Sequence, residues 1–177
     1  MSLRHFFIAS SLILAPITTL GFGSAAFSNT DSDTVELSGT VDSQIAIDAD
    51  RTNYAANSPL SPLAAGQDGS TTVHIADLDI TSNNPVGIII TASSLNGGGE
   101  LVGSIQDTAI PYTIAIVNNG AGTPTSTTSV SSLNQNVNGF DTETGIKSMD
   151  LYIKYSVGGM PKMGTYTDTL TITVSDN

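Results

Sequence analysis

The side chains that most often carry out chemistry in proteins are scarce in this sequence. It has no cysteine and two histidines, His5 and His74. After the first 26 residues, His74 has no second histidine and no thiolate with which to hold zinc or copper. It occupies a position of a strand-like segment whose odd residues are apolar, so we expect a solvent-facing side chain without a ligand. Neither a nucleophile elbow nor a phosphate-binding loop is present.

Aspartate pairs are the other candidates for chemistry. Residues 31–33, 48–50 and 77–79 each contain two aspartates separated by one residue. Their oxygens could bind calcium, but none has the spacing of an EF-hand loop with its closing glutamate, and solvated strand edges explain them equally well. A weak calcium site therefore stays open. Paired carboxylates could also act on glycosides, but acidic residues are too frequent here to single out one pair. We expect no enzyme activity, no cofactor and no metal centre.

The first 26 residues have the pattern of a secretory signal peptide. Arg4 and His5 precede an apolar run over 6–17, and a small-residue segment ends at Ala26. The apolar run is shorter than the roughly 20 residues of a membrane-spanning helix. We expect export with cleavage after Ala26, a domain division into 1–26, 27–41 and 42–177, and no membrane span in the mature chain.

Charge and composition narrow the range of partners. The formal net charge is -11, from five basic and sixteen acidic residues. Removing the signal removes one basic and no acidic residue, which leaves 4 − 16, or about −12. Such a chain is not expected to bind nucleic acid or an anionic lipid surface, because both need lysine and arginine. Without disulfides, its stability must come from the hydrophobic core.

The positioning elements predicted by the sequence are β-strands. In residues 34–41 (TVELSGTV), the odd positions Val35, Leu37, Gly39 and Val41 alternate with polar residues, and a polar arm over 28–33 precedes them. Alternation of period two is typical of a strand with one apolar face. Similar alternation occurs at Ile45, Ile47 and Ala49.

Further strands are predicted along the rest of the chain. Residues 71–80 change parity near Ala76 and Asp77, which indicates either a β-bulge or a strand that changes sheet. Residues 86–92 form a continuous apolar run typical of a strand covered on both faces. Strands are also expected over 110–117, 149–157 and 166–174, the last two joined as a hairpin or crossing between two sheets. Loop chemistry dominates 51–70. Residues 118–139 are expected to form either a surface loop or a pair of weak edge strands. Together these patterns predict an all-β fold, an antiparallel immunoglobulin-like β-sandwich of seven to nine strands.

Both ends of the chain resemble the subunits of chaperone–usher pili. Residues 34–41 are similar to the N-terminal extension of these subunits, in which an apolar-x-Gly-x-apolar stretch follows a polar arm. Residues 164–174 (GTYTDTLTITV) resemble their C-terminal strand, most closely that of the spore-coat-U-like branch. The sequence departs from the family in lacking a cysteine near the first strand and an aromatic residue beside the C-terminus.

The resemblance implies a sandwich that lacks one strand and is completed by a donor strand from the next subunit, a form of β-augmentation. Val35, Leu37, Gly39 and Val41 would then form the donor strand. The acceptor groove would lie between residues 149–157 and 166–174, lined by Leu151, Ile153, Tyr155, Val157, Leu170, Ile172 and Val174. A homo-polymer, a periplasmic chaperone and an outer-membrane usher would be its partners, and the protein would pass through the periplasm to the cell surface.

Two other functions fit the same residues. A monomeric secreted binding module or adhesin domain would fold residues 34–41 into its own sheet. A biofilm-matrix fibre protein of another lineage would polymerise without a chaperone. Alternation alone does not distinguish a strand placed in its own subunit from one placed in a neighbour.

Overall fold

The computed structural model describes residues 34–58, 60, 69–105, 108–157 and 161–177. The predicted signal peptide and the polar arm over 28–33 lie outside these residues. The chain divides between Gly39 and Thr40 into two units. Residues 34–44 contain neither strand nor helix, and all of their side chains are exposed. Among the described residues, no helix has the length and apolar character needed to cross a membrane.

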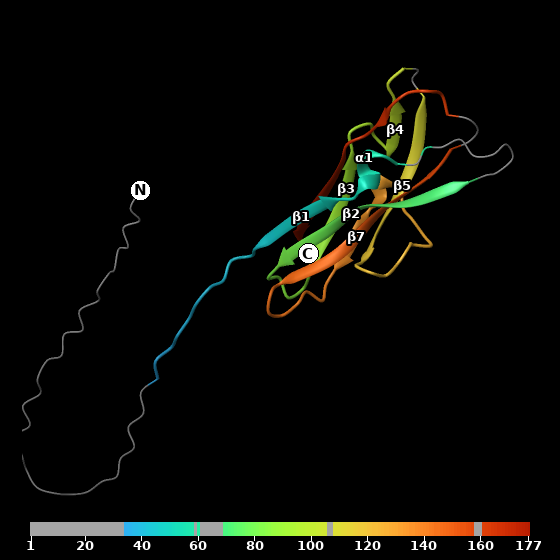
Figure 1. The fold of residues 1–177 in the computed structure, drawn as a ribbon. Helices are drawn as coiled ribbons and strands as arrows, with labels where there is room; N and C mark the ends of the chain where they lie inside the picture. The colour runs from blue at the N-terminus through green and yellow to red at the C-terminus, as the bar shows by residue number, and fades with distance from the viewer. Residues whose placement is uncertain (1–33, 59, 61–68, 106–107, 158–160) are drawn as a thin grey trace, which may run out of the picture. The chain divides into compact units, whose positions relative to one another are not determined.

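The unit that begins at Thr40 is built from two antiparallel sheets (Figure 1). The six-stranded sheet contains, in spatial order, β1 (Ile45–Arg51), β2 (Ser70–Ser82), β7 (Ile146–Ser156), β5 (Ala109–Asn118), β4 (Glu100–Gly103) and β8 (Tyr166–Thr167). The three-stranded sheet contains β6 (Asn134–Val137), β3 (Ile88–Ser94) and β9 (Leu170–Asp176). One turn of α-helix, α1 (Asn53–Ala56), and a 3-10 turn at Val130–Ser132 complete the described elements. The predicted all-β antiparallel sandwich is confirmed.

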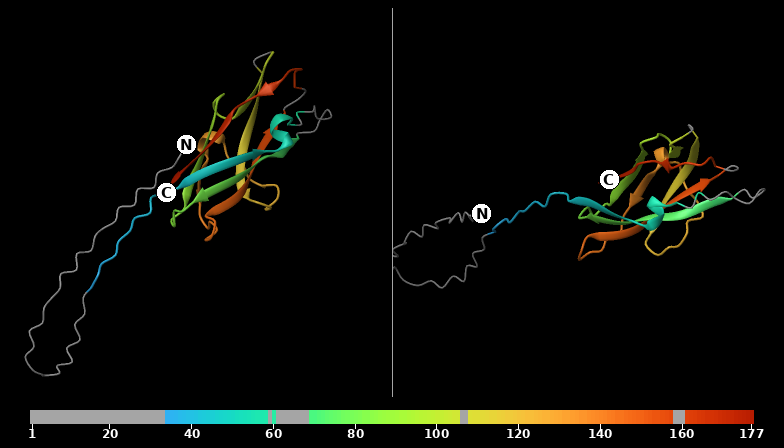
Figure 2. Two further views of the ribbon diagram at one scale, coloured as in Figure 1. Left: turned by 60° about the vertical axis from the view of Figure 1, so that its left-hand side comes forward. Right: turned by 45° about the horizontal axis from the view of Figure 1, so that its top comes forward.

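The core lies between the two sheets, and strand alternation explains its composition. Leu78 and Ile80 of β2 and Ile114 of β5 are 0% exposed, as are Ile88 and Ile90 of β3 across the sandwich. Side chains of successive strand residues point to opposite faces, so β2 buries every second residue from Ala76 to Ser82. Figure 2 shows β9 and the C-terminus in a different layer from β1 and β2. Without cysteines, this apolar layer supplies the stability that disulfides provide in many exported domains.

Two irregularities of the fold have defined positions, of which only the first was expected from the sequence. The register between β2 and β7 shifts between His74 and Ala76, so Ile75 is the extra residue of a β-bulge, slightly earlier than the sequence indicated. Helix α1 lies in a segment predicted as loop. Thr52 caps it by accepting a hydrogen bond from the Tyr54 backbone at 3.3 Å. A single turn without a buried residue leaves no periodic pattern from which it could be predicted.

Two other segments refine the sequence predictions. In β3, Ile88 and Ile90 are buried but Ile89 is only half-buried, so the apolar run is not covered equally on both faces. In the 118–139 segment, the three apolar residues Val130, Leu133 and Val137 are all buried, at 1%, 8% and 3% exposure. They fix the 3-10 turn and the edge strand β6 against the core.

A matched pair of substitutions in β3 tests this description of the core. We expect Ile90→Ala to lower the free energy of unfolding by about 2–5 kcal/mol, because it leaves a cavity between the sheets. Ile89→Ala removes the same atoms from the half-buried face and should cost clearly less. Urea unfolding of the two variants beside the parent protein measures both values. Equal losses would show that the two faces of β3 are covered alike.

Candidate functional site

The last two long strands of the chain lie in different sheets. Strand β7 pairs with β2 on one edge and with β5 on the other, so both of its edges are occupied. Strand β9 pairs with β3, and no other described strand pairs with it. Of the two alternatives left open by the sequence, the crossing between sheets is therefore observed. A donor strand therefore cannot insert between β7 and β9 within one sheet, as the sequence-based prediction of the acceptor groove would require.

The free edge of β9 carries unused backbone hydrogen-bonding groups. The backbone N–H of Leu95 donates to the carbonyl of Thr169 at 2.9 Å, in the same register as the β3–β9 ladder. In an antiparallel pair, hydrogen-bonded and non-bonded positions alternate along the strand. Leu170, Ile172 and Val174 therefore direct their N–H and C=O groups away from β3. These three residues are the ones whose side chains pack against the core.

An open groove runs beside this edge, between β9 and β1. It has a volume of about 430 Å³. Strand β1 forms one wall through Ile47 and Ala49, and β9 forms the other through Leu170 and Ile172. The floor is made by core side chains of the six-stranded sheet: Ile75, Ala76, Leu78, Leu151 and Ile153. The core of the sandwich thus borders this groove along one side.

Polar contacts hold the C-terminal end of β9. At that end, the Asp176 carboxylate accepts hydrogen bonds from the Ser43 hydroxyl at 3.0 Å and the Asn84 side-chain amide at 2.8 Å. These bonds tie the last residues of β9 to the segment before β1 and to the turn after β2. Arg51 and Asp168 are among the residues that line the groove, where they add polar groups to its apolar surface.

The Asp168 carboxylate joins three elements at the start of β9. It accepts hydrogen bonds from the Ser94 and Tyr112 hydroxyls, both at 2.6 Å, and from the Asn96 backbone N–H at 3.2 Å. Asn96 also donates its side-chain amide to the Thr167 carbonyl at 2.8 Å. One carboxylate therefore connects the β8–β9 junction to the end of β3 and to β5, and it sets the position of the free edge.

These bonds have opposite effects on the two ionisable partners. Partial burial tends to raise the pKa of Asp168, but the hydrogen bonds from Ser94, Tyr112 and two backbone N–H groups outweigh it, so the pKa lies below the usual value. Burial, followed by the hydrogen bond to the Asp168 carboxylate, raises the pKa of the Tyr112 hydroxyl. At neutral pH, Asp168 is therefore an ionised acceptor and Tyr112 a neutral donor.

The four residues predicted to form the donor strand lie in the exposed N-terminal segment. Val35, Leu37 and Val41 are 79%, 92% and 83% exposed. A Cβ added to Gly39 would meet nothing within 4 Å. These four residues do not belong to a strand, although their sequence has strand alternation. Apolar side chains on an unpaired segment with this alternation are suited to an interaction outside the described fold.

The seven residues predicted to line the acceptor groove divide into two groups. Leu151 and Ile153 of β7 lie on its floor, and Leu170 and Ile172 of β9 form one wall. Tyr155 and Val157 are buried, at 2% and 9% exposure, and do not line it. Val174 is partly buried on β9 beyond the groove lining.

The sequence did not predict that β1 forms a wall of the groove, nor the hydrogen bonds of Asp168. The alternation at Ile45, Ile47 and Ala49 indicates a strand, but no pattern shows that this strand faces β9. Asp168 interrupts the apolar alternation just before Leu170, which is a local signal of a special position. Its partners Ser94 and Tyr112 are 74 and 56 residues away.

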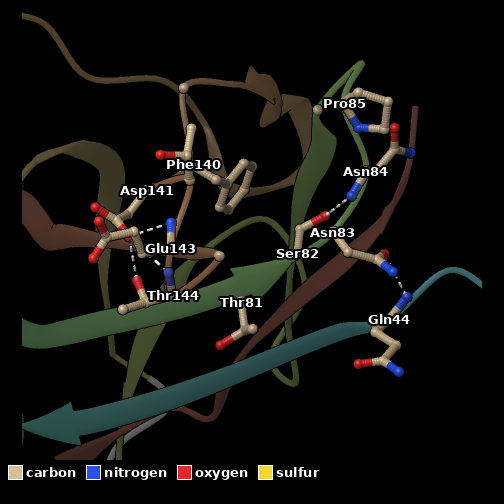
Figure 3. Close-up of a pocket in the computed structure, with 14 residues that line it drawn as sticks. Gln44, Thr81, Ser82, Asn83, Asn84, Pro85, Phe140, Asp141, Glu143 and Thr144 are labelled. Atoms are coloured by element: carbon tan, nitrogen blue, oxygen red, sulfur yellow. Dashed lines mark hydrogen bonds between the residues drawn. The ribbon is translucent and has the colours of Figure 1, made fainter.

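A second, more polar cavity of about 600 Å³ lies between the turn after β2 and the loop before β7. Figure 3 shows Phe140 between the Asp141–Thr144 loop and the turn at Ser82–Pro85. The Asp141 carboxylate accepts hydrogen bonds from the Glu143 and Thr144 backbone, at 3.0 and 2.7 Å. These bonds and one from the Thr144 hydroxyl lower the pKa of Asp141. A general acid for glycoside hydrolysis needs a raised pKa, whereas the pKa of Asp141 is lowered. Its carboxylate instead holds the 141–144 loop through these hydrogen bonds.

Comparison with known proteins gives distant likenesses to solved structures, one of which is described below. No protein-family model matches the chain, and no curated protein does. The fold is similar to a chain in the crystal structure of the CsuC–CsuE chaperone–tip adhesion subunit pre-assembly complex from archaic chaperone-usher Csu pili of Acinetobacter baumannii. The identity is 15%, the TM-score is 0.43, and the match covers 76% of this chain and 40% of that one. The chain thus spans less than half the length of that relative, and a likeness this distant carries no argument about function.

The Asp168 hydrogen bonds predict a specific acid sensitivity. The folded-state pKa of Asp168 is below its unfolded value of about 3.9. The resulting stability is present above about pH 4 and is lost as the pH falls through the folded-state pKa. We expect Asp168→Asn to lower the free energy of unfolding at pH 7 by about 1–3 kcal/mol. It should also flatten the loss of stability between about pH 4 and pH 2.

Denaturant unfolding as a function of pH measures both effects, with Glu100→Gln as the control. Glu100 is an exposed carboxylate on β4, so its substitution should leave the acid profile nearly unchanged. If both variants had the profile of the parent protein, the Asp168 carboxylate would not support the start of β9.

Proposed function

We propose that this protein is the structural subunit of an exported surface fibre that assembles by donor-strand exchange. Residues 35–41 of one copy would insert beside β9 of the next copy and complete its sandwich. One observation carries the proposal: the free edge of β9 borders an open apolar groove, in a chain whose strand-patterned residues 35–41 are exposed and unpaired.

The segment matches β9 in length and the groove in chemistry. Residues 35–41 are as many as the seven residues of β9. An inserted strand would satisfy the outward N–H and C=O groups of Leu170, Ile172 and Val174. Burying Val35, Leu37 and Val41 over the groove floor would contribute about 1.5–3 kcal/mol each. The backbone bonds would fix the register, because a slip by one residue turns the apolar side chains away from the groove.

Gly39 supports a contact with another molecule. No close neighbour requires the absence of a side chain at this position, because an added Cβ would lie in open space. Its backbone φ is also outside the positive range that favours glycine, unlike that of nine other glycines. A missing side chain would instead allow the segment to approach a shallow part of the groove of the next copy.

Asn83 favours a neighbouring copy over the chain's own groove. Its side chain accepts a hydrogen bond from the Gln44 backbone N–H at 2.8 Å and donates to the Asp42 carbonyl at 2.9 Å (Figure 3 shows the first). Its backbone N–H donates to the Gln44 carbonyl at 3.3 Å. Folding residues 35–41 back along β1 would need a turn at 42–44 and would break the bond to Asp42. A monomeric binding module with this strand in its own sheet is therefore the less favoured function.

An open groove also implies partners during export. Uncovered apolar surface beside a free strand edge promotes unwanted association. We infer that a periplasmic chaperone covers the groove until assembly, and that an outer-membrane usher receives the subunit. The secretory pattern of the first 26 residues supports passage through the periplasm to the cell surface. We infer that the protein is not an enzyme and needs no organic cofactor.

Neighbouring substitutions in the N-terminal segment test the apolar face. We expect Leu37→Asn to abolish or strongly reduce fibres, because it places an amide where an apolar side chain would be buried. Ser38→Asn introduces the same residue on the opposite face and should leave assembly nearly intact. Detergent-resistant, heat-sensitive multimers on gels, together with electron microscopy of cell surfaces, measure assembly. Deletion of residues 27–41 should also leave unassembled subunits, and fibres formed by this deletion variant would refute the proposal.

Gly39→Leu separates assembly from folding. We expect this variant to block polymerisation, since the new side chain would meet the groove of the next copy. The free energy of unfolding of the monomer should change by less than about 0.5 kcal/mol, as for an exposed site. Chemical denaturation of the monomer and gel analysis of multimers give the two readouts. A loss of several kcal/mol in the monomer would place the segment inside its own domain.

A further inference from the structure

A cluster of one imidazole and two carboxylates lies on the outer face of the six-stranded sheet, on the side of β2 and β7 that faces away from the core. The ligating atoms of His74, Asp77 and Asp150 all lie within 4.8 Å of one another. His74 Nε2 is 3.3 Å from Asp77 Oδ1. This is the only ion pair among the described residues, so no described lysine or arginine is in ion-pair contact with either carboxylate.

The β-bulge in β2 brings His74 and Asp77 to the same face. In a regular strand, residues three apart point to opposite faces. The extra residue Ile75 restores the parity, so His74 and Asp77 act as next neighbours on one face. Thr52 holds the bulge, since its hydroxyl donates to the His74 carbonyl at 2.6 Å and its N–H to the Ile75 carbonyl at 2.9 Å.

The pairing of β2 with β7 places the second carboxylate. Asp150 lies directly opposite Asp77 in the ladder, and Asp50 of β1 lies opposite Asp77 on its other side. Like charges directly opposite each other destabilise a sheet. Asp150 is 6% exposed, and its Oδ2 accepts a hydrogen bond from the Gly120 N–H at 3.1 Å. A cation held between these carboxylates would offset their repulsion.

The imidazole is held with Nε2 towards oxygen atoms. The ring of His74 stacks on Tyr152, with the ring centroids 5.0 Å apart. Nε2 is 2.9 Å from the Ala76 carbonyl oxygen, so this nitrogen faces a backbone oxygen as well as the Asp77 carboxylate. Without a metal, a proton on Nε2 would be donated to the Ala76 carbonyl oxygen. A metal ion would take the place of this proton, with the ring proton on Nδ1 and the Nε2 lone pair directed at the ion.

We propose that His74, Asp77 and Asp150 bind one divalent transition-metal ion of the Zn²⁺ class. An imidazole with carboxylates suits zinc and its neighbours in the first transition row, whereas calcium prefers oxygen ligands alone. Three protein ligands leave a coordination position for water. The ion would join β2 to β7 across the outer face. None of the three proposed ligands lines the groove between β1 and β9. The metal site therefore does not depend on the strand-exchange proposal.

Isothermal titration of ZnCl₂ into the purified full chain tests the proposal. The protein carries no polyhistidine tag and is first stripped with EDTA, which is then removed. We expect one Zn²⁺ per chain, at least about tenfold weaker binding for His74→Gln and for Asp77→Asn, and no competition by an equal concentration of CaCl₂. Co²⁺ should give the visible absorption spectrum of a nitrogen–oxygen site in the parent protein and lose it in His74→Gln.

Asp79→Asn is the matched control. It removes the same charge from the same strand, but Asp79 is bonded to the Ser148 hydroxyl at 2.6 Å and is not a member of the cluster. It should bind Zn²⁺ as tightly as the parent protein. Circular dichroism checks that each variant is folded. If Asp77→Asn does not fold, the Zn²⁺ affinity of His74→Gln alone tests the site. Absence of Zn²⁺ binding, equal binding by His74→Gln, an equal loss in Asp79→Asn or displacement by Ca²⁺ would each overturn the proposal.

Discussion

The free edge of β9 is the constraint on which the rest of this structure depends. Backbone N–H and C=O groups in a sheet need partners, and apolar side chains need cover. In β9, the same three residues have both needs: Leu170, Ile172 and Val174 point their backbone groups outward and their side chains towards the core. Because β1 lies across the groove in the other sheet, a single added strand could satisfy both needs at once. Residues 35–41 carry the complementary pattern, with an apolar residue at every second position except Gly39.

A sandwich that is open along one side must hold that side in place by other means. At one end, Asp176 binds Ser43 and Asn84, and at the start of β9 Asp168 binds Ser94 and Tyr112. Hydrogen bonds to a carboxylate are stronger than those between neutral groups. These two aspartates bracket β9 and keep its free edge extended.

The two faces of the six-stranded sheet serve different purposes. The inner face is apolar and continuous with the groove floor. The outer face of β1, β2 and β7 carries aspartates opposite one another, and the bulge at Ile75 adds His74 to them. The same bulge changes which parity of β2 faces the core, from Val73 to Ala76, Leu78 and Ile80. One inserted residue thus determines both the packing of the core and the composition of the outer cluster.

The sequence by itself determined the class of fold, the alternation of each main strand, the change of parity in β2 and the unusual N-terminal segment. These features are local: period two, β-branched residues and turn residues are read within about ten positions. Only the tertiary structure decided that β7 and β9 belong to different sheets, that β1 forms the second wall of the groove, and that Asp168 meets Tyr112. Alternation tells which face a side chain occupies, but it does not tell which strand lies alongside. That choice depends on packing and backbone pairing between residues far apart in the chain, as between Asp77 and Asp150.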